Sequence, residues 1–138
     1  MKSTLSLLLL LASIIMSTPA LARSTVPAIN LDNIAITSAS GASLKDSDVE
    51  QAIITAAGIN QWSITKKEPG EIIAKLVVRN KHMIEVKILY SATQYSLLYS
   101  GSDNMKYELK DSTTYIHPFY NKWVAALRES IDRELLRR

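Results

Sequence analysis

The chain has 138 residues, a formal net charge of +3 and no cysteine, and 47% of its residues are hydrophobic. This composition is typical of one globular domain and excludes a disordered chain and a multidomain enzyme. The lack of cysteine excludes disulfides, thiolate nucleophiles and thiolate metal sites. The weak, scattered charge does not predict nucleic-acid binding, which needs a clustered basic surface.

Residues 1–22 have the pattern of a secretory signal peptide. Lys2 precedes an apolar run from Leu5 to Met16, and the small-residue sequence Ala20-Leu21-Ala22 follows. The run has 12 residues, fewer than the roughly 18 that indicate a membrane-spanning helix. We therefore expect export to the periplasm, cleavage after Ala22 and no transmembrane span in the mature protein. Arg23 stands where a lipoprotein has its lipid-bearing cysteine, so no lipid anchor is expected.

The first predicted elements lie between the cleavage site and residue 58. Residues 23–42 are rich in Ser, Thr, Ala and Asn and predict a flexible lead-in, with one short strand at Ile34 and Ile36. A helix is expected over 48–57, because apolar residues recur there at helical spacing. Ser47 and Glu50 fit a capping box at its start, and Gly58 is expected to end it. The folded domain is expected to span residues 43–138.

From residue 62 the period of the apolar residues changes from 3.6 to 2, which predicts strands. Four runs, near residues 62–68, 72–78, 84–90 and 95–99, are separated by short turns such as Pro69-Gly70 and Asn80-Lys81. An antiparallel meander with one solvent-exposed face follows from this pattern.

The C-terminal part of the chain predicts a polar loop followed by a long helix. Residues 101–115 are mostly polar, and Met105-Lys106-Tyr107 is the expected short strand within them. The helix begins at His117-Pro118 and has one apolar stripe. The predicted fold class is α+β, with an antiparallel sheet of about four strands and an N-terminal and a C-terminal helix packed on one face.

One group of polar residues around this helix start is the candidate ligand or partner site: Ser102, Asn104, Tyr107, His117, Tyr120 and Asn121. A helix N-terminus presents unpaired N–H groups and a partial positive charge, so it favours an anion or a carboxylate. The competing interpretation is structural, with Ser102 and Asn104 capping turns, His117 capping the helix, Tyr120 in the core and Asn121 fastening the loop. We favour the structural interpretation. With two histidines and no metal-ligand spacing, the sequence predicts no metal, no cofactor and no catalytic residue.

Several segments resemble a family of small exported proteobacterial proteins, mostly described as uncharacterised lipoproteins or hypothetical periplasmic proteins. They include Gly70-Glu71-Ile72-Ile73-Ala74-Lys75-Leu76, Tyr90-Ser91-Ala92-Thr93-x-Tyr95-Ser96, Ser102-x-Asn104-Met105-x-Tyr107 and Ile116-His117-x-x-Tyr120-Asn121-x-Trp123. The likeness spans about residues 47 to 131. It implies a protein of the Gram-negative cell envelope and implies no catalytic activity.

Two functions are compatible with the sequence. The first is a non-enzymatic binding module that contacts a protein or an envelope component through the exposed sheet face or the 101–116 loop. The second is a small periplasmic hydrolase or ligand-processing enzyme that uses His117 with a nearby Tyr or Ser. We favour binding, because no nucleophile and base occur at a recognisable catalytic spacing.

Overall fold

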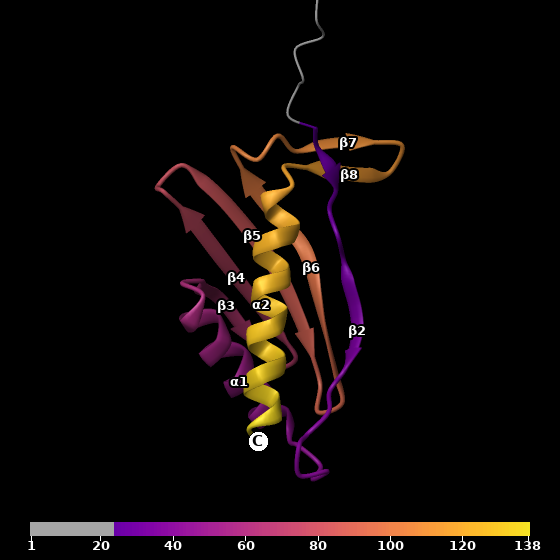
Figure 1. Ribbon diagram of the computed structural model, residues 1–138, viewed down its shortest axis with the longest axis vertical. Helices are drawn as coiled ribbons and strands as arrows, with labels where there is room; N and C mark the ends of the chain where they lie inside the picture. The colour runs from indigo at the N-terminus through magenta and orange to yellow at the C-terminus, as the bar shows by residue number, and fades with distance from the viewer. Residues whose placement is uncertain (1–23) are drawn as a thin grey trace, which may run out of the picture.

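The computed structural model describes residues 24–138, so the predicted signal peptide, residues 1–22, and Arg23 lie outside the described part of the chain. The described residues form an α+β fold with two helices and two antiparallel sheets of five and three strands (Figure 1). The predicted fold class is confirmed. The expected sheet of about four strands is corrected to eight strands in two sheets among these residues.

The four strands predicted from the alternating pattern form a meander within the larger sheet. They are β3 (Ser63–Glu68), β4 (Glu71–Val78), β5 (His82–Tyr90) and β6 (Gln94–Asp103). β4 and β5 pair in unbroken register, with Ile72 opposite Ile88 and Ala74 opposite Val86. Because side chains alternate between the two faces of a strand, this register gathers the apolar residues on one buried face.

The two helices, α1 (Asp46–Ile59) and α2 (Phe119–Leu136), pack against each other. Figure 1 shows both on the same side of the five-stranded sheet. The Asn60 side chain joins them, since its Nδ2 donates to Ser130 Oγ at 2.7 Å and to the Ala56 carbonyl at 2.9 Å. The end of α1 is thereby fastened to the middle of α2.

The core lies between the two helices and the apolar face of the five-stranded sheet. Ile53 of α1, Leu127 of α2 and Ile84 of β5 are fully buried members of one continuous apolar cluster. Truncating such a residue to alanine costs about 2–5 kcal/mol, because transfer free energy is lost and a cavity remains.

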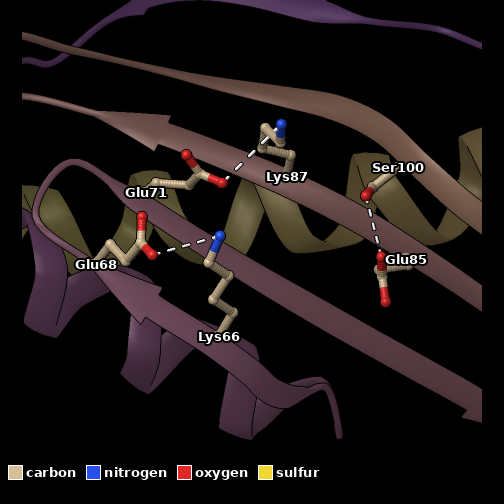
Figure 2. A network of polar contacts seen from close by, with 6 residues as sticks. All are labelled: Lys66, Glu68, Glu71, Glu85, Lys87 and Ser100. Atoms are coloured by element: carbon tan, nitrogen blue, oxygen red, sulfur yellow. Dashed lines mark hydrogen bonds and ion pairs between the residues drawn. The ribbon is translucent and has the colours of Figure 1, made fainter.

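The opposite face of the sheet carries polar side chains, as the alternation predicts. Figure 2 shows this face, with the helices behind the strands. Its contacts are Lys66–Glu68 at 3.4 Å, Lys87–Glu71 at 4.0 Å and Ser100 Oγ donating to Glu85 Oε1 at 3.0 Å. Each exposed ion pair contributes about 0–1 kcal/mol to stability. These polar contacts therefore cover the exposed face of the sheet but contribute little to its stability.

The expectation of a flexible lead-in over residues 23–42 is corrected, because this segment contributes two strands. β2 (Leu31–Ala35) pairs with β6 and extends the larger sheet, and it includes Ile34 of the predicted short strand. β1 (Val26–Pro27) pairs with β8. Both strands pair with strands that are distant in the sequence, so the local pattern indicates part of β2 but neither β1 nor the two pairings.

The polar stretch 101–115 forms the end of β6 and a hairpin. The predicted strand at residues 105–107 is wrong: these residues lie in a loop, and Met105 is buried. The strands are β7 (Glu108–Lys110) and β8 (Thr113–Ile116), joined through Asp111 and Ser112, both with positive φ. Together with β1 they make the three-stranded sheet.

The ends of α1 also differ from the prediction. Lys45 is the N-cap residue, and its backbone N–H donates to Asp48 Oδ2 at 2.9 Å, so the Ser47–Glu50 capping box is wrong. Glu50 instead accepts a hydrogen bond from the Tyr90 hydroxyl at 2.7 Å. Gly58 lies inside the helix rather than ending it.

Candidate functional site

A pocket opens at the end of the sheet where α2 begins. Three segments meet there: the turn between β4 and β5, the loop after β6, and the first turn of α2. The pocket has a volume of about 380 Å³, near the lower end of the range for small-molecule sites. Its lining residues are Arg79, Lys81, His82, Asn104, Met105, Lys106, His117, Phe119 and Trp123.

The turn between β4 and β5 has an unusual backbone. The Lys81 N–H donates to the Val78 carbonyl at 3.1 Å and closes a turn whose central residues, Arg79 and Asn80, have φ of 55° and 53°. A turn with two positive φ angles suits the twist of a hairpin and normally selects Asn and Gly. Asn80 tolerates this conformation, whereas Arg79 adopts it at a cost. The predicted turn at Asn80-Lys81 thus begins one residue earlier.

The loop after β6 is tied to this turn by two hydrogen bonds. His82 Nδ1 donates to the Asn104 carbonyl at 2.8 Å, and Asn104 Nδ2 donates to the Lys81 carbonyl at 3.2 Å. A carbonyl only accepts, so the His82 ring carries a proton on Nδ1. Asn104 and Lys106 have φ of 54° and 55°, so this wall of the pocket also holds left-handed residues. The two loops are fixed relative to each other.

The third wall is the start of α2. The His117 N–H donates to the Met105 carbonyl at 2.8 Å, and His117 Nδ1 accepts from the Phe119 N–H at 3.1 Å. The second bond satisfies the N–H of the first residue of α2, the role that the structural interpretation expects of His117, although Pro118 is the N-cap residue. The rings of Phe119 and Trp123 lie 5.6 Å apart, and the ring centroids of His117 and Phe119 are 4.7 Å apart.

The charged side chains that line the pocket are of one sign. Arg79, Lys81 and Lys106 contribute a guanidinium and two ammonium groups, and no carboxylate occurs among the described lining residues. Lys122 lies beside the pocket, with its Nζ 5.8 Å from the centre of the Phe119 ring. A concave surface lined by one sign of charge concentrates counter-ions, so this pocket favours an anion.

The structure separates the six residues of the predicted site into three groups. Asn104 and His117 line the pocket. Ser102, Tyr107 and Tyr120 surround Tyr99: the Ser102 and Tyr99 hydroxyls are 2.8 Å apart, Tyr107 stacks on Tyr99 at 5.4 Å, and Tyr120 meets it edge-on at 5.5 Å. Burial raises the pKa of both the Tyr99 and Tyr120 phenols. These residues pack against one another beside the pocket.

Asn121, the sixth residue, has a structural contact instead. Its Oδ1 accepts from the Ile29 N–H at 2.9 Å, and its Nδ2 donates to the Pro27 carbonyl at 3.0 Å. Asn121 therefore fastens the segment between β1 and β2 to α2. The expectation that it fastens the 101–116 loop is corrected.

Sequence reasoning missed most of the cationic and aromatic lining, namely Arg79, Lys81, Lys106, Phe119 and Trp123. Arg79 and Lys81 are charged residues in a hairpin turn, which is ordinary for a solvent-exposed loop. Only the closure of the sheet brings this turn beside Lys106, more than twenty positions away in the sequence. Four non-glycine residues with positive φ around one pocket are visible only in the structure.

Comparisons of the chain with protein-family models, curated proteins and solved structures found no match. Neither α1 nor α2 of the described residues has the length and apolar character needed to cross a membrane. Among residues 24–138 no three His, Asp or Glu side chains are grouped so that they could hold a metal ion.

Proposed function

We propose that this protein is a non-enzymatic binding module of the bacterial envelope, and that its ligand is an anion held in the pocket between the β4–β5 turn, the loop after β6 and the start of α2. One observation carries the proposal: three cationic side chains and two aromatic rings line a single pocket without any carboxylate. Export to the periplasm is part of the proposal and rests on the sequence of residues 1–22 alone.

The backbone of the pocket supports this function. Left-handed residues with a Cβ cost stability and occur where the surrounding structure has a use for them. Arg79 and Lys106 both have this conformation, and both have cationic side chains in the lining. A hairpin turn selected for stability alone would have glycine or asparagine at the position of Arg79.

Binding accounts for His117 better than hydrolysis does. A hydrolase that used His117 would need a nucleophile within hydrogen-bond reach of the ring. None of the described lining residues is a serine, threonine, tyrosine or carboxylate. The Nδ1 atom of His117 accepts from the helix backbone, so this atom has a capping role.

Titration with pyrophosphate, followed by two-dimensional NMR of backbone amides, tests the proposal. We expect the largest shifts at residues 79–82, 104–106 and 117–119. The double variant Lys81→Gln/Lys106→Gln should bind at least about tenfold more weakly, because both charge-assisted contacts are lost. The double variant Lys66→Gln/Lys110→Gln removes the same charge elsewhere and should bind as the wild type does. Shifts spread evenly over the lysines of the molecule would contradict the proposal.

A further inference from the structure

The number and type of the cations indicate which anionic group the pocket accepts. A carboxylate has one negative charge, whereas a phosphate monoester has about −1.5 to −2 at neutral pH. Three cations, Arg79, Lys81 and Lys106, converge on this pocket from two loops. The Arg79 guanidinium matches two phosphate oxygens in a fork, and the lysine ammonium groups act as point charges. A doubly charged phosphate ester suits this set better than a carboxylate.

The aromatic wall indicates that the ligand is larger than inorganic phosphate. Phe119 is 50% exposed although it begins a helix whose other large apolar residues are mostly buried. Its ring and that of Trp123 are tilted by 45° to each other at the side of the pocket. Covering exposed apolar surface contributes about 25 cal/mol per Å². The C–H face of a sugar ring can cover such a wall, whereas a phosphate ion cannot.

A hydrogen-bond acceptor in the lining indicates hydroxyl groups on the ligand. Arg and Lys only donate, so they cannot recognise an O–H as a donor. Asn104 also lines the pocket; its Nδ2 donates to the Lys81 carbonyl, and its Oδ1 is an acceptor. A phosphate dianion has no proton to donate to such an acceptor, whereas a sugar hydroxyl can donate one.

We infer that the pocket binds a phosphorylated sugar, with the phosphate at Arg79, Lys81 and Lys106 and the sugar ring against Phe119. This inference rests on the proposed function, and it names the class of ligand for the same site. The phosphorylated ring can belong to a free sugar phosphate or to a lipid headgroup.

Isothermal titration with three probes tests the inference: glucose phosphorylated at its primary hydroxyl, inorganic phosphate, and glucose. The sugar phosphate should bind about tenfold more tightly than inorganic phosphate, a difference of about 1.4 kcal/mol. Glucose alone should not bind measurably. Sedimentation with phosphatidylcholine vesicles, with and without phosphatidylinositol phosphate, distinguishes a lipid-borne ligand from a free one.

Two sets of variants separate the parts of the site. Phe119→Ala should abolish the preference, so that the sugar phosphate and inorganic phosphate bind to this variant with equal affinity. Its control is Leu136→Ala, which truncates a residue that is 48% exposed at the other end of the same helix. Lys81→Gln/Lys106→Gln should weaken both phosphates, whereas Lys66→Gln/Lys110→Gln should weaken neither.

The outcomes distinguish this inference from the proposed function. Equal affinity for the sugar phosphate and inorganic phosphate, both lost in Lys81→Gln/Lys106→Gln, would overturn the sugar and leave the anion site standing. Failure of both phosphates to bind would overturn the two together. A preference for the sugar phosphate that survives Phe119→Ala would also refute the assigned pose.

Discussion

The left-handed conformation of Arg79 leads to a prediction that joins stability to binding. Arg79 lies at the first central position of the β4–β5 turn with a φ of 55°, and it lines the cationic pocket. Glycine adopts this conformation without a steric cost. Replacing Arg79 by glycine should therefore stabilise the turn and remove one positive charge from the pocket.

The size of the stabilisation follows from two opposing contributions. A left-handed residue with a Cβ costs about 1–2 kcal/mol, and glycine loses about 0.5–1 kcal/mol more backbone entropy on folding than alanine does. The difference predicts that Arg79→Gly raises the free energy of unfolding by about 0–1.5 kcal/mol. The same variant should bind pyrophosphate several-fold more weakly, because the guanidinium is lost.

Urea unfolding followed by circular dichroism measures the first effect, and pyrophosphate titration measures the second. Asn80→Gly is the matched control, since Asn80 has nearly the same φ, 53°, and does not line the pocket. Asparagine tolerates this conformation, so Asn80→Gly should change stability little and binding not at all. An Arg79→Gly variant that is less stable, or that binds as the wild type does, would refute the reasoning.

Three further predictions concern residues outside the pocket. Asn121→Ala should lower the free energy of unfolding by about 1–2 kcal/mol, because two hydrogen bonds to residues 27–29 are lost, while pyrophosphate affinity stays unchanged. A drop in affinity without a drop in stability would show that Asn121 belongs to the site. Tyr120→Phe should raise the free energy of unfolding by about 1 kcal/mol, because the buried Tyr120 hydroxyl has no hydrogen-bond partner among the described residues; a less stable variant would contradict this. The pKa of Tyr95 is raised by burial and by its hydrogen bond to Asp132, so its contribution to stability is complete below pH 10.0 and declines as the pH rises above that value. In Tyr95→Phe this alkaline decline, measured by urea unfolding at several pH values, should be shallower, and an unchanged decline would count against the assignment.

The parts of the fold that the sequence predicts correctly are those with strong local periodicity. The helix that begins after His117-Pro118 has an apolar stripe over five turns, and in β5 buried residues alternate with more exposed ones from Ile84 to Tyr90. The sequence predicts part of β2, at Ile34, but not its pairing with β6, because that partner is distant in the sequence. The β7–β8 hairpin is misplaced because its strands have only three and four residues. Polar and charged residues interrupt the apolar ones there, so the local pattern resembles that of a loop.

The candidate site was predicted only in part for a related reason. The sequence predicts His117 and Asn104 as polar residues near a helix start, and both line the pocket. It predicts Tyr107 and Tyr120 on the same grounds, but these two residues pack around Tyr99. A pocket made by three separate loops is a property of tertiary structure, and no single segment of the sequence has its pattern of charge.

The attachment of the first strands to the last elements also determines the order in which the molecule can fold. β1 pairs with β8, and Asn121 binds residues 92 and 94 positions earlier in the chain. Residues 26–29 therefore lack these partners until residues 115–121 have been synthesised, whereas β2 can pair with β6 earlier. Contacts of such large sequence separation slow folding, because a long loop must close before they form. In newly made chains the first strand should thus remain unattached until α2 is complete. The pocket at the start of α2 should be among the last features to form.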